Sequence, residues 1–152
     1  MAIATGTMTI TITEALDVGT TVMDTATSVA ETITVNDIFK RVITVPTSEI
    51  NIYSTHGSIP QGSTFDNNAV KYARITNHDT SNYVHLRVSN NEGDEFVYKL
   101  AAGQSFMLWG HVGTMNASQA AALTLGTGES SIADVGIQAN SDAVDCEILI
   151  AS

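Results

Sequence analysis

Apolar and polar residues alternate along most of this chain, and the alternation predicts β-strands. Residues 7–14 read Thr-Met-Thr-Ile-Thr-Ile-Thr-Glu, so methionine and isoleucine share one face and threonine lines the other. A period of two residues is typical of a strand that buries one face. Segments with this pattern, or rich in β-branched and aromatic residues, give nine further predicted strands: 32–35, 39–45, 49–55, 71–77, 83–89, 95–100, 104–109, 132–138 and 144–150.

Turn-forming residues separate these segments, and the segments recur about every 8–12 residues in the central block, which is typical of sandwiches and barrels. We therefore predict an all-β fold, an antiparallel β-sandwich of the jelly-roll kind, in a single domain over residues 1–152. An alanine-rich stretch at 116–123 predicts one short helix, with a strand as the alternative.

The N-terminal segment, 1–31, is predicted to be an extended arm. Its strand at 7–14 is followed by residues 15–31, which carry small and polar side chains without clear periodicity and favour irregular or extended structure. Two arrangements fit this pattern. The strand pairs within its own sandwich, or it adds to the sheet edge of a neighbouring molecule.

The central strands can be aligned so that their apolar residues fall on one side. In this register 71–77 pairs with 83–89, and 83–89 pairs with 95–100. A shift of one residue would invert the faces, so the register is well specified if it is correct. Its apolar pairs are Ala73–Leu86, Ile75–Val84, Val88–Phe96, Leu86–Tyr98 and Val84–Leu100.

The opposite side of this predicted sheet is basic and aromatic. It carries Tyr72, Arg74, Tyr83, His85, Arg87 and Lys99. Arginine and tyrosine are favoured at the centres of interfaces, so one interpretation is a partner-binding face that meets an acidic surface. The other is an ordinary solvent-facing side, in which the tyrosines cover their cross-strand neighbours.

Charge limits the range of partners. The chain has sixteen acidic and six basic residues, a net charge of −10, and every base lies between Lys40 and Lys99. Binding to nucleic acid depends on lysine and arginine, so neither nucleic acid nor an anionic membrane surface is an expected partner. The N-terminus lacks the basic and apolar regions of a signal peptide, and no apolar run approaches the ~20 residues of a membrane span, so we expect synthesis in the cytoplasm.

No motif in the sequence predicts catalysis. The single cysteine, Cys146, alternates with apolar residues and is predicted to be a core residue instead of a nucleophile. The segment 126–130 lacks the lysine of a phosphate-binding loop. We therefore predict no catalytic residue, no cofactor and no enzymatic activity.

Three features leave a ligand site open. The first feature is the set of four histidines, His56, His78, His85 and His111, although no two of them have the short spacing typical of metal ligands. The oxygen-rich segment 90–95 suits either calcium or a hairpin turn. Trp109 suits either stacking on a sugar or packing in the core. The simpler interpretations are that the histidines are exposed to solvent, that 90–95 is a turn and that Trp109 packs in the core. We therefore predict no metal site.

Several central segments resemble the small β-sandwich structural proteins of tailed bacteriophage virions. The segments that carry the resemblance are Ala73-Arg74-Ile75-Thr76-Asn77, Val84-His85-Leu86-Arg87-Val88, Phe96-Val97-Tyr98-Lys99-Leu100, Gly103-Gln104-Ser105-Phe106-Met107-Leu108 and the closing Ile132-Ala133-Asp134 with Ala143-Val144-Asp145-Cys146-Glu147-Ile148. The resemblance covers about half of the chain, and its motifs are largely those of antiparallel strands in general. Proteins of this kind have no catalytic residues to transfer.

The resemblance implies a location and a role. It implies a capsid decoration (cement) protein or a minor tail component of the virion, often a homotrimer, that binds the major capsid protein, another virion protein or neighbouring copies. The alternative is a carbohydrate- or receptor-binding module of a phage tail, using exposed aromatic residues and the loops 56–68 and 110–118. An enzyme with an unrecognised site is the third hypothesis.

Overall fold

The computed structural model describes residues 5–14, 27–54, 63–64, 70–109, 114–115 and 130–152. The chain divides into two compact units, Met1–Asn36 and Asp37–Ser152. The first contains the predicted N-terminal arm, and the second contains a β-sandwich. Every regular element in the described ranges is a strand, which confirms the predicted all-β class.

The first unit contains an antiparallel hairpin of β1 (Gly6–Glu14) and β2 (Thr27–Val35). Thr9 lies opposite Thr32, and their hydroxyl oxygens are 3.3 Å apart. The second strand begins at Thr27 and not at residue 32, so its predicted start was wrong. Among the strands described, the first strand pairs only with this second strand. In this pairing Val29 faces Ile12, whereas Glu31 faces Ile10, so the alternation at the start of the second strand is too weak to show where it begins.

Ten strands are described in the second unit, and they form two sheets. One sheet has the order β3-β12-β6-β9, with bounds Ile38–Val45, Val144–Ala151, Tyr72–Asn77 and Ser105–Trp109. The other has the order β5-β4-β11-β7-β8, with bounds Ser63–Thr64, Ile50–Ser54, Ser130–Ala139, Val84–Asn90 and Glu95–Leu100. The short strand β10 (Thr114–Met115) pairs with β11.

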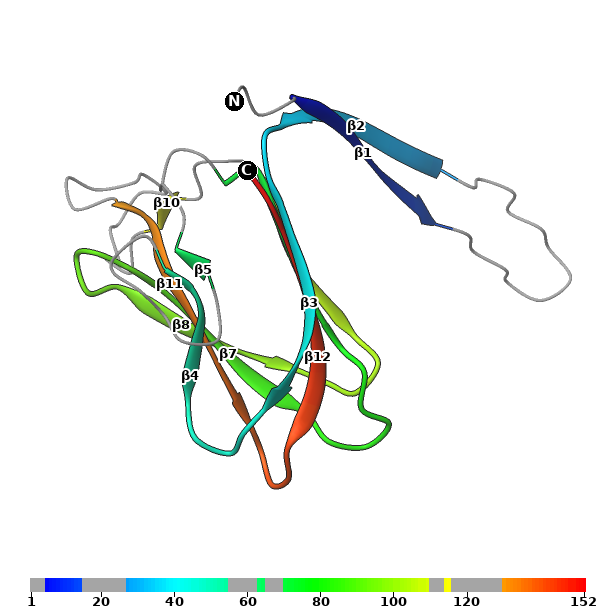
Figure 1. Ribbon diagram of the computed structural model, residues 1–152. Coiled ribbons are helices and arrows are strands. Elements are labelled where there is room, and N and C mark those ends of the chain that lie inside the picture. Colours follow the sequence, from blue (N-terminus) through cyan, green and yellow to red (C-terminus); the bar gives the residue numbers. More distant parts are fainter. Residues whose placement is uncertain (1–4, 15–26, 55–62, 65–69, 110–113, 116–129) are drawn as a thin grey trace, which may run out of the picture. The chain divides into compact units, whose positions relative to one another are not determined.

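The eight longer strands of this unit have the connectivity of a jelly roll. Along the chain, β3, β6, β9 and β12 belong to one sheet, and β4, β7, β8 and β11 belong to the other. All pairings among these eight are antiparallel. The two strands nearest the C-terminus occupy inner positions: β12 lies between β3 and β6, and β11 lies between β4 and β7 (Figure 1). This confirms the predicted sandwich.

Apolar side chains from the two sheets form one core between them. Its members on the β3-β12-β6-β9 sheet include Ile43, Val45, Ala73, Ile75, Val144, Cys146, Ile148 and Ile150. Its members on the other sheet include Ile52, Val84, Leu86, Val88, Leu100, Val135, Ile137 and Ala139. The alternation in the sequence therefore predicted correctly which face of most strands is buried, and Cys146 is a core residue, as expected.

One of the two predicted central pairings is correct. β7 and β8 pair in the expected register, with Val84 opposite Leu100 and Val88 opposite Phe96. The hairpin between β6 and β7 was wrong, because the connection after Asn77 crosses from one sheet to the other. Ala73 and Ile75 therefore belong to the sheet opposite β7. Alternation specifies the buried face of a strand and leaves its neighbour undetermined.

The turns on either side of β8 contain glycines in the left-handed region of backbone space. Gly93 has a φ of 91° and Gly103 a φ of 71°, which only glycine adopts readily. The predicted helix at 116–123 lies outside the residues that the structure describes. Within the described ranges, no helix has the length and hydrophobicity needed to cross a membrane.

Candidate functional site

The six residues predicted to share a basic and aromatic face lie on two different sheets. Tyr83 precedes β7, and His85, Arg87 and Lys99 lie on β7 and β8, with His85 directly opposite Lys99. Tyr72 and Arg74 lie on β6, in the opposite sheet. The predicted face is therefore reduced to four residues on the outer side of the β7–β8 pair.

The two residues on β6 are also unsuited to the predicted role. Tyr72 is only 4% exposed, so it is not a solvent-facing side chain. Arg74 binds Glu147 of the neighbouring strand β12 at 2.5 Å, and Lys40 of β3 binds the same carboxylate at 3.2 Å. The hydrogen bond from Lys40, with a further one from Arg74, lowers the pKa of Glu147 despite its partial loss of hydration.

Three of the remaining residues form a cluster on the outer side of the sheet. The rings of Tyr83 and His85 meet edge to face, with centroids 5.1 Å apart. The Lys99 ammonium nitrogen lies 4.1 Å from the centroid of the Tyr83 ring, which is the geometry of a cation–π contact. The Tyr83 ring is thus already occupied by a cation of its own chain.

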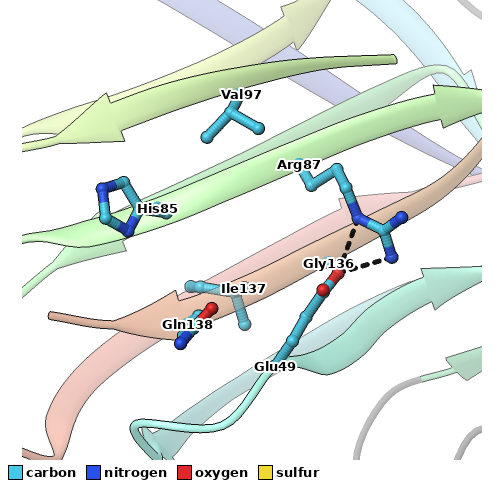
Figure 2. Close-up of a pocket in the computed structure, with 7 residues that line it drawn as sticks. All are labelled: Glu49, His85, Arg87, Val97, Gly136, Ile137 and Gln138. Atoms are coloured by element: carbon cyan, nitrogen blue, oxygen red, sulfur yellow. Dashed lines mark hydrogen bonds and ion pairs between the residues drawn. The ribbon is translucent and has the colours of Figure 1, made fainter. Parts of the chain in front are cut away.

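Beside this cluster, the outer side of the sheet contains a shallow hollow of about 200 Å³. Its walls come from three strands, β7, β8 and β11, and from the residue before β4. Figure 2 shows the lining residues: Glu49, His85, Arg87, Val97, Gly136, Ile137 and Gln138. Three of these belong to β11, which runs beneath the hollow between β4 and β7. The hollow therefore depends on the pairing of strands that are distant in sequence.

Arg87 is neutralised within this site. Its Nε donates a hydrogen bond to Glu49 Oε1 at 2.7 Å, and its Nη2 lies 2.6 Å from the same oxygen. Its Nη1 lies 3.2 Å from Glu95 Oε2 on β8. These hydrogen bonds, first that to Glu49, raise the pKa of the guanidinium above its ordinary value. Two carboxylates thus balance Arg87 and Lys99, and the site has no net charge.

Gly136 makes the contact between Glu49 and Arg87 possible. The register of β11 against β4 shifts between Val135 and Gly136, which marks a bulge. A Cβ atom at Gly136 would clash with the Glu49 carboxylate and lie 3.1 Å from its Cδ. Figure 2 shows the Glu49 and Arg87 side chains reaching towards each other across this glycine. The missing side chain therefore leaves room for the ion pair.

The hollow offers groups suited to an uncharged, hydroxyl-rich ligand. The imidazole of His85 makes no hydrogen bond within the described part of the chain, and the amide nitrogen of Gln138 donates to Thr47 O at 2.7 Å, which leaves the amide oxygen of Gln138 as an acceptor. Val97, which is 61% exposed, adds an apolar wall. An anion would meet Glu49 and Glu95 beside Arg87, so the electrostatics disfavour phosphate and carboxylate ligands.

Metal and nucleophilic chemistry receive no support from the described residues. Among them, no group of three or more histidine, cysteine, aspartate or glutamate side chains is placed to hold a metal ion. In the oxygen-rich turn, Asn90 Oδ1 accepts hydrogen bonds from the backbone N–H groups of Glu92 and Asp94, which is the turn interpretation. Burial raises the pKa of the Cys146 thiol to about 12, so it is not an activated nucleophile.

A second surface, which the sequence analysis missed, is the β8–β9 edge, defined here as Phe96, Val97, Tyr98 and Met107. These large apolar side chains are 41%, 61%, 42% and 42% exposed, respectively. β8 and β9 each end one of the two sheets, among the strands described, and the ring of Tyr98 contacts that of Phe106 on β9, with centroids 5.1 Å apart. The sandwich therefore exposes aromatic residues along one side.

A signal for this edge is present in the sequence. Phe96, Val97 and Tyr98 are three consecutive large apolar residues, so one of the two faces of the strand must present apolar groups away from the core. The sequence contains no comparable signal for the hollow, because the hollow depends on the bulge at Gly136 and on the approach of Glu49 to Arg87. No family model, no curated protein and no solved structure matches this chain.

Proposed function

We propose that this chain is a non-enzymatic structural protein of a tailed-phage virion, a capsid decoration (cement) protein or a minor tail component that associates with further copies of itself. The observation that carries the proposal is the β8–β9 edge. Soluble proteins seldom leave several large aromatic and aliphatic side chains exposed at the edge of a sandwich unless another subunit covers them. The resemblance of the central strands to virion proteins supplies the location.

Other features agree with an assembly role. Arg87 and Arg74 are paired within their own chain, so their charges do not have to be met by an acidic partner. The cysteine is buried, and no metal cluster is found among the described side chains. These observations favour a protein that contributes surfaces instead of chemistry, and they shift the expected interface from the basic face to the β8–β9 edge.

The proposal is tested by quantitative mass spectrometry of purified particles of the phage that encodes the chain. We expect its peptides in every preparation, at a constant ratio to those of the major capsid protein. The control is an abundant non-structural protein of the same phage, which must disappear from the particles on purification. Particles that lack the chain to the same degree as this control would refute a virion role.

The hollow beside Arg87 favours a second candidate function, the binding of a neutral carbohydrate. Its volume lies below the range of ~300–1,000 Å³ typical of pockets for drug-sized ligands, so it suits a single sugar ring. We expect affinities of about 1 mM for such a small contact. The hollow would then serve receptor recognition by the same virion.

Binding is measured by NMR titration with neutral monosaccharides, namely glucose, galactose and N-acetylglucosamine. His85→Ala removes an imidazole that lines the hollow and should abolish the chemical shift changes. His78→Ala is the matched control, because His78 is an exposed histidine outside the hollow, bound through its backbone N–H to Asp145. The absence of shifts with all three sugars, or equal loss in both variants, would contradict this candidate.

A further inference from the structure

Among the strands that the structure describes, β8 ends its sheet and presents a free edge. Of the strands described, it pairs only with β7, and five of its six residues are exposed. It contains no proline and no bulge, two of the devices that protect an edge from pairing with another strand, although it carries two charged residues, Glu95 and Lys99. The edge is therefore competent to extend the sheet.

The hydrogen-bonding groups on this edge can be assigned from the register. The backbone N–H of Asn90 donates to the carbonyl of Asp94, which makes these two a hydrogen-bonded pair at the start of the β7–β8 ladder. Hydrogen-bonded and non-hydrogen-bonded pairs alternate along an antiparallel ladder. The N–H and C=O groups of Glu95, Val97 and Lys99 therefore point away from β7, towards the free side.

The side chains of β8 are complementary to themselves in reverse order. The sequence reads Glu95-Phe96-Val97-Tyr98-Lys99, with an acid and a base at equal distances from Val97 and an aromatic residue on either side of it. In an antiparallel pairing of two such strands centred on Val97, each glutamate would face a lysine and each phenylalanine a tyrosine. Opposite charges and aromatic pairs are the favourable cross-strand neighbours.

We propose that two copies of the chain pair through β8 about a two-fold axis at Val97. Val97 of each copy then exchanges both backbone hydrogen bonds with its counterpart, and Glu95 does so with Lys99 of the other copy. The two β4-β11-β7-β8 sheets join into one continuous sheet across the axis. Phe96 and Tyr98, exposed in a single copy, pack against the same two residues of its partner copy.

The charged residues of β8 favour a second copy of the chain, and not an unrelated acidic strand, as the partner that pairs with this edge. Two molecules with a net charge of −10 repel each other over most approaches. The stretch from Glu95 to Lys99 has no net charge, and a partner that carries the same sequence in the opposite direction places a lysine opposite each glutamate, in addition to the contacts of Glu95 with Arg87 and of Lys99 with Tyr83 in its own chain. An all-acidic strand would leave Glu95 facing a like charge. This inference deepens the proposed assembly role by naming the interface and its symmetry.

The first test removes one central hydrogen bond donor. Val97→Pro deletes the N–H that points to the free edge, a position where a monomer tolerates proline. Multi-angle light scattering should give a mass of twice 16.0 kDa for the wild type and 16.0 kDa for this variant. Met107→Pro is the matched control on β9: Asn77 N–H donates to Gln104 O, so the alternation directs the Met107 N–H away from β6, and the dimer should persist.

A second test uses charge and does not depend on proline. Glu95→Lys alone places lysine opposite lysine and should weaken the dimer by on the order of tenfold, the effect of a lost cross-strand charge pair together with a new repulsion. The double variant Glu95→Lys with Lys99→Glu restores opposite charges in the same register and should restore dimerisation. Circular dichroism and thermal unfolding establish that each variant is folded.

The outcomes separate this inference from the virion role. A wild-type monomer at all concentrations, a trimer, or a folded Val97→Pro variant that still dimerises would overturn the β8 pairing. Failure of the charge-reversed double variant to recover would overturn its register. None of these results concerns the presence of the chain in particles, which the mass spectrometry decides independently.

Discussion

Asn77 is a buried polar residue whose side chain joins three parts of the sandwich. Its Nδ2 donates to the carbonyl of Asn82 at 2.9 Å and to that of Leu100 at 3.3 Å, and its Oδ1 accepts the backbone N–H of Asp79 at 2.9 Å. It thereby connects the end of β6 to the chain that crosses between the sheets and to the end of β8. A fully satisfied buried amide is tolerated in a core because every polar atom has a partner.

Replacing Asn77 with alanine should lower the free energy of unfolding by about 2–4 kcal/mol, because two carbonyls and one N–H lose their partners in a buried site. Urea denaturation followed by circular dichroism measures the change. Asn91→Ala is the matched control, since Asn91 is an exposed asparagine in the β7–β8 turn, and it should stay within about 0.5 kcal/mol of the wild type. Equal losses in the two variants would contradict the role assigned to Asn77.

Single residues differ in how far the sequence predicts them. Cys146 lies in a strongly alternating strand, and its burial follows directly from that pattern. Tyr72 is in phase with the half-buried Arg74 and Thr76 of β6 and is nevertheless buried, which the alternation within its own strand does not predict.

At the scale of elements, most strands of the sandwich were predicted, and the pairing of strands was predicted only where a short hairpin imposes it. The β7–β8 register follows from a turn in which Gly93 adopts a positive φ and Asn90 binds the backbone. The connection from Asn77 to Tyr83 is hardly longer, but the Asp79 carboxylate accepts the N–H groups of Ser81 and Asn82 and helps to shape a crossing between sheets. Both connections are rich in the same turn-forming residues, so composition alone does not distinguish them.

The candidate sites illustrate the same limit. His85 and Lys99 were placed together correctly, because both belong to the β7–β8 hairpin. The hollow is completed by residues distant in sequence from β7, namely Glu49, Gly136 and Gln138. The alternation does not indicate that these residues lie beside β7. The three consecutive apolar residues of β8 indicate an exposed apolar surface, but the sequence does not show that β8 and β9 end their sheets among the strands described.

For the whole molecule, stability should depend on pH in two ranges. Burial raises the pKa of Cys146 to about 12 from 9.0 and that of Tyr53 to about 12 from 10.0. The unfolded chain therefore releases protons from about pH 9 upwards that the folded chain retains, so stability decreases as the pH rises through this range. On the acid side, the hydrogen bond from Lys40 lowers the pKa of Glu147 and the backbone N–H groups of Asn82 and Ser81 lower that of Asp79, so stability decreases as these carboxylates become protonated.

Urea denaturation at a series of pH values, with reductant present, measures this profile. We expect a plateau from about pH 5 to about pH 8.5 and a decline on either side, with signs set by the linkage between proton binding and folding. Cys146→Ala should be less stable throughout, because it leaves a cavity, but its stability should decline less steeply between about pH 9 and 10. Parallel profiles for the two proteins above pH 9 would contradict the contribution of the thiol.

The inner positions of β11 and β12 determine the order in which the sandwich can form. Among the described strands, β3 has β12 as its only neighbour, and residue 38 pairs with residue 151. Among the same strands, β4 pairs with β11 and with the two-residue strand β5. If β11 and β12 are left out, only the β6–β9 and β7–β8 pairings remain among the eight longer strands of this unit. Contacts between such distant residues must close large loops before they contribute, which makes folding slow. A nascent chain therefore cannot complete either sheet progressively; both close late and together, when the segment from Ser130 onward arrives.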